Sequence, residues 1–595
     1  MDLICVELTS KMTLTVKILI DDRNYNTWSF RNYLNISEIP AIPELSQIHP
    51  AKHRLFSGDV FVIPELMSDK SPTCEIVNSP VRSASLLAGV LQLSANKTYG
   101  RTANKKRLLY KCIPDDKRIP AFLIPYEPKV GFSKVQSNKY VVFRFDEWTD
   151  THPHGKLVEV IGDVGSLDAF YEYQLYCKSL HISIAEITNE AKTALKRSPI
   201  QAYIEQIRQN PVYNVQDRIS NYHIFTIDPV NSLDFDDGFS IRPHQTNPDY
   251  RIISVYIANV YVWLEAMGLW NSFSQRVATI YLPDHRRPML PTILSDDLCS
   301  LQAGKDRFAF TMDLTVVCET GEILFDEIRF SNTLIRVSKN YRYEDRALLY
   351  DPAYDELAQI TAKIDKTVVN SHDVVSFWMI QMNTICAQYL AKKQVGIFRA
   401  VSFTGPTQNL DSVVANIDAR RVINMWNNTS GQYLSYSPDA ILDHELMDKK
   451  SYIHITSPIR RLVDLLNQMI FAQELMGVSF TVDASDFLTK WLGQLDYLNA
   501  SMRSIRKIQT DCDLLYRCTT DPEIMSGQYK GIVFDKVCKN DGSGVRTYMV
   551  YLEKLKMLSR IIISTDLPNY QSANFKLFLF EDEDQCKRKI RLQIV

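Results

Sequence analysis

The sequence predicts a multidomain α+β protein, and three observations lead to this prediction. A chain of 595 residues is long enough for three to five domains. Its first 190 residues read mostly as short strands and turns, which is typical of small β-barrels. From about residue 180, helical patterns appear and then alternate with further strands, which is typical of a mixed α/β region.

The composition is that of an ordinary globular protein, with 45% hydrophobic and 23% charged residues. The net charge is −2, so a surface for nucleic acid would have to be a local basic patch. The N-terminus lacks a signal-peptide pattern, and no run of about 20 apolar residues is present. The eleven cysteines show neither a CxxC motif nor a Cys/His metal spacing. We therefore expect reduced thiols, an intracellular location and no membrane association.

Three segments of the N-terminal region read as strands, because apolar residues alternate or run together and end at turn residues. They are 59–64, 121–125 and 140–145. Residues 97–107, which lie between the first two, interleave basic and aromatic side chains. Such a segment suits either a single-stranded nucleic-acid surface or a solvated basic loop, and the sequence favours neither.

The most informative stretch is 226–241, which follows a short buried strand predicted at 223–227. Proline, asparagine, serine and glycine interrupt regular structure there, so we expect a loop that leaves a rigid strand. Four carboxylates lie within ten residues of one another: Asp228, Asp234, Asp236 and Asp237.

Carboxylates this close repel one another and raise each other's pKa unless water or cations relieve the charge. Mg²⁺ prefers such oxygen ligands, Mn²⁺ is a possible substitute, and two ions can clamp the two oxygens of a phosphoryl transfer. The alternatives are an acidic surface loop and a calcium loop. The calcium pattern fails, because Gly238 at its glycine position would make Leu233 the first ligand. A solvated loop would not need the interleaved apolar residues.

A second stretch, 451–464, contains the run Thr456-Ser-Pro-Ile-Arg-Arg. Ser457 followed by proline predicts a helix start, which would hold Arg460 in the first turn with Asp464 bracing it. An arginine fixed there is well placed for a phosphate, although a surface Arg–Asp pair is an equal alternative. His454 is read as a strand or core histidine, because nothing pairs it with a second histidine.

Together, the aspartate spacing, the block 281–301 and the run 456–461 resemble the ribonuclease II (RNB) family of processive 3′→5′ exoribonucleases. Residues 123–181 resemble the second cold-shock domain of the eukaryotic exosome catalytic subunit. The resemblance also implies that the chain opens near the first cold-shock domain, without that subunit's N-terminal PIN domain.

The resemblance implies four domains. Two cold-shock OB β-barrels are expected at 1–110 and 111–190, and a central mixed α/β RNB catalytic domain at 191–518. An S1-like OB barrel is expected at 519–595. In the family, the barrels form a basic funnel that leads single-stranded RNA to the acids.

The family also implies residue roles. Two Mg²⁺ ions would be held by the four aspartates, while Arg460 would neutralise charge on the phosphate in the transition state. Tyr281 would stack on a base near the 3′ end, the alternative being a core tyrosine. Arg399, Tyr343 and Arg461 are weaker candidates for RNA contacts. The expected product is a nucleoside 5′-monophosphate, and the expected form a monomer, with docking on an exosome-like complex as an alternative.

The chain departs from the family pattern at several positions. Asn259 stands where an aspartate is usual, Gln468 stands where a histidine is usual, and the region 335–375 looks shortened. Two other classes of function therefore stay open. One is a catalytically weak or inactive RNA-binding scaffold, and the other is a general phosphodiesterase acting on DNA or small nucleotides.

Overall fold

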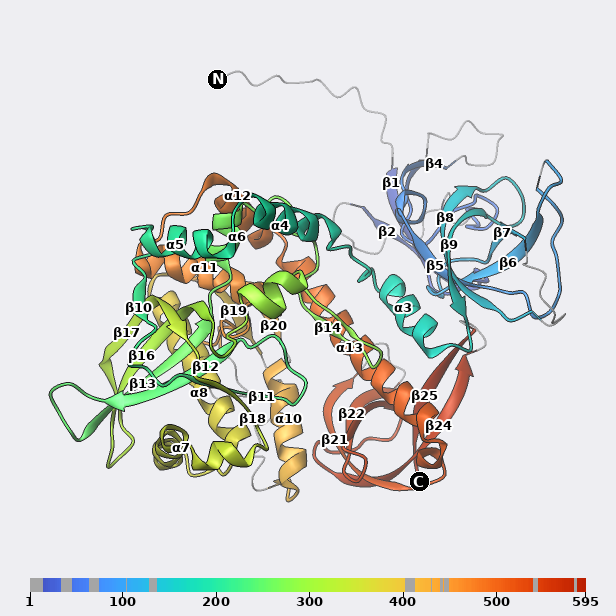
Figure 1. Ribbon diagram of the computed structural model, residues 1–595. Coiled ribbons are helices and arrows are strands. Elements are labelled where there is room, and N and C mark those ends of the chain that lie inside the picture. The colour runs from blue at the N-terminus through green and yellow to red at the C-terminus, as the bar shows by residue number, and fades with distance from the viewer. Residues whose placement is uncertain are drawn as a thin grey trace.

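The computed structural model describes residues 14–33, 45, 47–63, 74–102, 104–127, 136–401, 413–429, 431–438, 442–443, 449–538, 544–582 and 586–595. The N-terminal β-structure and the C-terminal sheet lie on one side of the molecule, and the mixed α/β part lies on the other (Figure 1). Two helices, α3 (Leu167–Cys177) and α13 (Leu495–Thr520), run between them. None of the helices in the described ranges combines the length and the hydropathy needed to cross a membrane.

The N-terminal region contains a four-stranded sheet of order β2-β1-β3-β4 and a closed barrel of order β5-β6-β7-β9-β8. The sheet strands are β1 (Leu14–Ile20), β2 (Trp28–Asn32), β3 (Val60–Ile63) and β4 (Glu75–Asn78), and the short helix α2 (Pro80–Ser83) follows. The barrel strands are β5 (Leu87–Leu91), β6 (Leu108–Pro114), β7 (Phe122–Tyr126), β8 (Lys139–Glu147) and β9 (His154–Asp163). A small β-barrel is therefore confirmed.

The expected boundary between residues 110 and 111 is wrong, because it falls inside β6. Strand β5 belongs to the second barrel, since it pairs with both β6 and β8 and closes the ring. The sheet and the barrel also share one hydrophobic core. Phe56, ahead of β3, stacks on Phe122 of the barrel at 5.9 Å between ring centroids and lies 4.7 Å from Trp148.

The mixed region is built on a seven-stranded sheet of order β10-β17-β16-β13-β12-β11-β18. Its strands are β10 (Gln216–Arg218), β11 (Phe225–Asp228), β12 (Asp237–Pro243), β13 (Tyr250–Ala258), β16 (Asp306–Val317), β17 (Ile323–Arg336) and β18 (Lys339–Arg342). Strand β11 pairs antiparallel with β12 and parallel with β18. The acidic segment is thus the connection between two neighbouring strands.

Helices and short elements surround this sheet. They are α4 (Ala185–Arg197), α5 (Ile200–Gln209), α6 (Tyr261–Met267), β14 (Ile280–Tyr281), β15 (Arg286–Arg287), the π-helix η1 (Ile293–Leu298), η2 (Arg346–Tyr350), α7 (Pro352–Ile364), α8 (Ser371–Lys392), β19 (Ile397–Ala400), α10 (Ile417–Thr429), β20 (Gln432–Ser435), α11 (Leu462–Met476) and α12 (Val482–Leu492). Phe471 of α11 packs on Phe310 and Phe330 of the sheet at 5.3 and 4.6 Å. This contact fixes α11 on the face from which it approaches the acidic segment.

The C-terminal sheet has the order β23-β22-β21-β24-β25. Its strands are β21 (Tyr529–Cys538), β22 (Arg546–Leu552), β23 (Met557–Ile563), β24 (Ser572–Asp582) and β25 (Lys587–Ile594), and η4 (Pro522–Met525) precedes them. The edge strands β23 and β25 lie near each other, and both contact α13. Helix α10 packs on the same sheet (Figure 1). The S1-like identity of this part stays a prediction.

Candidate active site

The β11–β12 connection positions the acidic residues as the sequence predicts. Asp228 is the last residue of β11, and Asp237 is the first residue of β12. Asp228, Asp236 and Asp237 are buried, with exposed fractions of 8%, 3% and 9%. Asp236 is held further by its own carbonyl, which accepts a hydrogen bond from the Ala258 amide at 2.8 Å. The three carboxylates therefore lie inside the protein rather than on a solvated loop.

Burial raises the pKa of all three carboxyl groups. For Asp236 the rise in pKa reaches about 8, although the Arg460 charge and a backbone hydrogen bond oppose it. For Asp228 the charge of Asp237 adds to the effect of burial on the pKa. In each of the three, the buried Oδ2 atom has no hydrogen-bond partner. Unpartnered buried carboxylate oxygens are unfavourable unless something else binds them.

The run 456–461 does not begin a helix, so that prediction is wrong. The Ser457 carbonyl accepts hydrogen bonds from the amides of Arg460 and Arg461, at 3.2 and 2.9 Å, which closes a turn. Arg461 is extended, and α11 begins only at Leu462. The chain must stay extended at Arg461 because this residue bridges to Ala278 on a distant segment.

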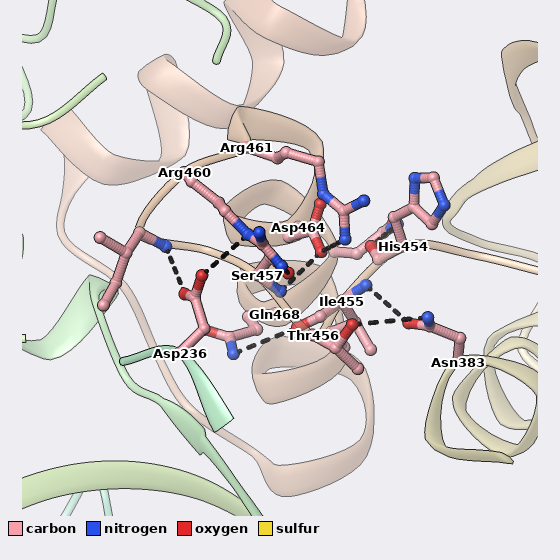
Figure 2. Close-up of polar contacts among 12 residues, drawn as sticks. Asp236, Asn383, His454, Ile455, Thr456, Ser457, Arg460, Arg461, Asp464 and Gln468 are labelled. Carbon is pink, nitrogen blue, oxygen red and sulfur yellow. Dashed lines mark hydrogen bonds and ion pairs between the residues drawn. The ribbon is translucent and has the colours of Figure 1, made fainter. Parts of the chain in front are cut away.

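Asp464 braces this turn, but not through Arg460 as expected. Its Oδ1 accepts hydrogen bonds from the Ser457 amide and from Nη2 of Arg461, both at 2.8 Å. Asp464 is fully buried, so these bonds are shielded from water. Arg461 is thereby committed to the turn, which leaves Arg460 as the arginine that faces the acids (Figure 2).

The turn and the acidic segment meet at Asp236. The Ile459 amide donates to Asp236 Oδ1 at 3.0 Å, and Arg460 Nε lies 3.2 Å from Asp236 Oδ2 (Figure 2). Arg460 Nη2 also donates to the Ser457 hydroxyl at 3.0 Å. The Arg460 side chain remains 47% exposed, so its guanidinium can still reach a bound phosphate.

Three polar residues near the site have structural roles. Two of them, Asn259 and Gln468, depart from the family pattern, and the sequence suggested no role for the third, Asn383. Asn383 of α8 accepts a hydrogen bond from the Ile455 amide at 3.0 Å, and Gln468 of α11 donates to the Ala258 carbonyl at 3.3 Å. Asn259 donates to Asn332 at 2.9 Å. The Asn383 bond holds the segment that leads into the turn (Figure 2). Sequence spacing offered no signal for these long-range partners.

Asp234 has different surroundings from the other three acids. Its Oδ1 accepts a hydrogen bond from Arg286 Nη1 at 2.7 Å, and its Oδ2 accepts one from the Tyr281 hydroxyl at 3.3 Å. The other arm of Arg286 pairs with Asp296. Tyr281 is 42% exposed, so the alternative of a core tyrosine is wrong. Sequence reasoning missed Arg286, although this residue lies within the block 281–301.

Tyr343 and Arg399 are the remaining candidates for RNA contacts, and the structure places them differently. The Tyr343 amide donates to the Asp228 carbonyl at 3.2 Å, and its ring stacks on His372 at 3.7 Å. Arg399 is only 2% exposed and its guanidinium lies 4.4 Å above the Tyr433 ring, which places it in the interior. The structure therefore brings Tyr343 to the acids but gives Arg399 no surface for RNA, contrary to expectation.

A second polar feature lies between α13 and the C-terminal sheet. It is a cavity of about 200 Å³ whose walls include four basic residues, Arg503, Arg506, Lys507 and Arg560, and two acidic ones, Asp511 and Asp535. Arg506 lies 5.4 Å above the ring of Trp426, which also lines the cavity. This local concentration of positive charge is the kind of patch that a chain with a net charge near zero would need for nucleic acid.

A divalent cation fits the donor chemistry of the acidic site, because Asp228 and Asp237 each have a buried oxygen without a hydrogen-bond partner. The corresponding oxygen of Asp236 is already ion-paired with Arg460. Within the described ranges, however, no three His, Cys, Asp or Glu side chains already form a group that could hold a metal ion. A cation would have to draw these carboxylates together.

The fold and the site define an α+β protein in which small β-structures flank a carboxylate-bearing α/β domain. Residues 216–367 match the RNB domain, and residues 109–173 match the Dis3-like cold-shock domain 2 (CSD2). The chain therefore contains one segment that matches the RNB domain and one that matches this cold-shock domain, which confirms the resemblance seen in the sequence.

Similar proteins support this assignment. A ribonuclease R from Aquifex aeolicus is 22% identical over 455 residues, which cover 63% of this chain and 62% of the relative. The exosome complex exonuclease RRP44 of Mus musculus is 25% identical over 243 residues, which cover 40% of this chain and 24% of the relative. The chain thus spans less than two thirds of the length of these relatives.

Two solved structures share the fold. The Mycoplasma genitalium RNase R in complex with ribose-methylated single-stranded RNA aligns over 98% of this chain and 100% of that chain, with a TM-score of 0.64 and 17% identity. Yeast Ssd1, described as a pseudonuclease, aligns over 95% of this chain and 80% of that chain, with a TM-score of 0.56 and 13% identity.

Proposed function

We propose that this protein is a 3′→5′ exoribonuclease that hydrolyses single-stranded RNA to nucleoside 5′-monophosphates. The observation that carries this proposal is the meeting of Asp236 with Arg460, two residues from segments far apart in the chain. Buried carboxylates next to a half-exposed arginine suit a phosphodiester, whose charge increases in the transition state. The RNB and cold-shock matches support RNA as the substrate class.

Each residue of the site has its own role in this proposal. Arg460 binds the scissile phosphate and neutralises its developing charge, while the turn before α11 holds the arginine in place. Asp228, Asp236 and Asp237 would hold Mg²⁺, or Mn²⁺ in its place. Such an ion, when bound, supplies Lewis-acid activation of water and charge neutralisation. Tyr281, exposed beside the acids, stacks on a base, and the 2′-hydroxyl of RNA provides the means to reject DNA.

The test uses single-stranded RNA, the full chain and Mg²⁺ or Mn²⁺: a 3′ label follows release of the nucleoside 5′-monophosphate, and a 5′ label follows shortening of the strand. We expect stepwise shortening from the 3′ end, and its loss in Asp236→Asn. A matched DNA oligomer and an RNA duplex are run in parallel. Equal turnover of RNA and DNA would replace the proposal with a general phosphodiesterase.

A second candidate is an RNA-binding protein without nuclease activity. The Arg286–Asp234 ion pair favours it, because one of the four acids is already neutralised by the protein itself. The similar fold of Ssd1, which is named a pseudonuclease, is compatible with this candidate. RNA binding without mononucleotide release under either metal ion would support it and contradict the nuclease proposal.

A further inference from the structure

Gln468 of α11 makes contacts with both parts of the chain that meet at the site. Its side chain is fully buried, and its Nε2 donates hydrogen bonds to the Ala258 carbonyl at 3.3 Å and to the Ile455 carbonyl at 3.4 Å. A primary amide nitrogen carries two hydrogens, so it can serve both carbonyls at once. Both bonds are long, but they are shielded from water, which strengthens them. One side chain thus joins two segments that are distant in the sequence.

On the acidic side, the bond from Gln468 holds the end of β13. Ala258 is the last residue of this strand, and its amide donates to the Asp236 carbonyl at 2.8 Å. The carbonyl of Ala258 accepts the bond from Gln468. Ala258 is therefore held through both of its backbone polar groups, which fixes the backbone from which the Asp236 carboxylate extends.

On the arginine side, Gln468 holds the segment that enters the turn. The Ile455 carbonyl accepts its bond, while the Ile455 amide donates to Asn383 of α8 at 3.0 Å (Figure 2). The far end of the turn is held separately, because the Thr279 amide donates to the Arg460 carbonyl at 2.9 Å. Of these three contacts, the one from Gln468 is made by a side chain that also bonds to β13.

The direct contact between the two parts of the site gains from this support. The Asp236 carboxylate meets the Ile459 amide and the Arg460 guanidinium. A carboxylate can change its side-chain rotamer, so these contacts alone would allow several relative positions of the two backbones. The bonds from Gln468 act on the backbone carbonyls themselves. Its Oε1 has no hydrogen-bond partner, so this side chain contributes to the site as a donor.

We propose that Gln468 is a positioning residue, which sets the distance between Asp236 and Arg460 by donating to one backbone carbonyl in each part of the site. The inference rests on the proposed function for its effect on RNA hydrolysis, while the coupling of the two segments is independent of RNA. A reaction in which both residues act on one phosphate is sensitive to their spacing, because a displacement of about 1 Å can lower the rate about 10²-fold.

The first experiment measures single-turnover RNA hydrolysis and equilibrium RNA binding by the full chain carrying Gln468→Met. Methionine is unbranched and fills the space of the glutamine, but it has no donor. We expect kcat to fall about 10²-fold. RNA affinity should stay close to that of the wild type, because Tyr281 is unchanged. The matched control is Gln473→Met, the same exchange at an exposed position of α11, which should keep the wild-type kcat.

The second experiment follows amide hydrogen exchange by mass spectrometry, without RNA. Gln468→Met should speed exchange both at the end of β13, where the Ala258 amide lies, and in the turn, where the Ile459 amide lies. Gln473→Met should change neither segment. If Gln468→Met does not fold, Gln468→Asn replaces it in both experiments, because the shorter amide cannot reach both carbonyls.

Three results in a folded variant would each overturn the proposal: faster exchange in only one segment or in neither, a normal kcat with a lower melting temperature, or a loss of RNA affinity that accounts for the loss of turnover. Joint exchange of the two segments in a chain that does not hydrolyse RNA would refute the proposed function alone. Hydrolysis by the wild type with independent exchange of the two segments in the variant would refute this inference alone.

Discussion

Asp236 is the residue on which the site converges. It has an exposed fraction of only 3%, it accepts a hydrogen bond from the Ile459 amide, and it faces the Arg460 guanidinium. Such a carboxylate is unfavourable in the metal-free protein, since burial opposes its charge more strongly than one arginine supports it. Function and stability therefore oppose each other at this position.

We expect Asp236→Asn to stabilise the metal-free protein, and to do so more at high pH. The pKa of Asp236 is raised to about 8 from an ordinary value of 3.8, so the folded state binds the proton more tightly than the unfolded chain. The protonated Asp236 carboxyl group therefore adds to the free energy of unfolding below about pH 4. This contribution is lost as the pH rises through 8. Melting temperatures measured in EDTA, from mildly acidic to mildly alkaline pH, should diverge between wild type and variant. A constant difference would contradict the raised pKa.

Arg460→Ala should lower kcat about 10²–10³-fold, the usual effect of losing one donor to transition-state charge. RNA affinity should change little, because Tyr281 and the other proposed RNA contacts remain. Single-turnover hydrolysis and equilibrium RNA binding, measured on the same preparation, separate the two quantities. A large loss of affinity with normal turnover would mean that Arg460 only anchors RNA.

Tyr281→Ala should weaken RNA binding by about 1–3 kcal/mol, the range for one base stacked on an aromatic ring. Tyr281→Phe is the matched control, because it keeps the ring and removes only the hydroxyl that bonds Asp234. Binding is measured by fluorescence anisotropy with a labelled single-stranded RNA. An equal decrease of affinity in both variants would show that the hydroxyl, not stacking, matters.

At the scale of elements, the structure joins parts that are distant in sequence through buried polar contacts. The β11–β12 connection meets the turn before α11, and the C-terminal sheet meets the second barrel. In the latter contact, Lys587 Nζ of β25 lies 2.5 Å from Asp115 Oδ1, with side-chain exposures of 7% and 10%. Burial lowers the pKa of Lys587, the nearby Asp115 charge raises it, and the net shift is upward.

We expect Lys587→Met to cost about 3–5 kcal/mol, because it removes the buried counter-charge of Asp115. The double variant Asp115→Leu/Lys587→Met should recover most of that loss, since no buried charge remains. Thermal unfolding and limited proteolysis report the effect, with cleavage expected first in the C-terminal part. If the double variant is as unstable as the single one, packing of the lysine stem is responsible instead.

At the scale of the whole molecule, positive charge is gathered where α13 and the C-terminal sheet face each other. The net charge of −2 makes this local arrangement the relevant one for RNA. Arg503 and Arg560 line the same cavity of about 200 Å³ from α13 and β23. The exposed loop around Lys97 and Arg107 adds a second basic site on the N-terminal barrel.

Arg503→Glu/Arg560→Glu should weaken RNA binding and lower its salt dependence. The slope of log affinity against log salt should become shallower by about 0.7 for every phosphate that the variant no longer neutralises. Lys192→Glu is the matched control, an exposed charge reversal on α4. Binding is measured over a range of salt concentrations, with Asp236→Asn as the background to prevent hydrolysis. An unchanged slope would exclude this cavity from the RNA path.

The sequence by itself determined the parts of the protein that depend on local order. A short apolar strand, turn residues and closely spaced aspartates predicted the loop that carries Asp228 and Asp237, and small β-structure was predicted ahead of a mixed domain. These features depend on residues a few positions apart, whose backbone preferences and spacing can be read directly.

Only the tertiary structure decided which groups neutralise which charges. The Ile459 amide reaches Asp236 across 223 residues, and Asp464 binds Arg461 rather than Arg460. Arg286 takes Asp234 out of the acidic group, and Arg399 is buried against Tyr433. The physical reason is that an ion pair forms between whichever charged atoms packing brings within a few ångströms, and that packing is set by the long-range docking of α11 and β15 beside the sheet.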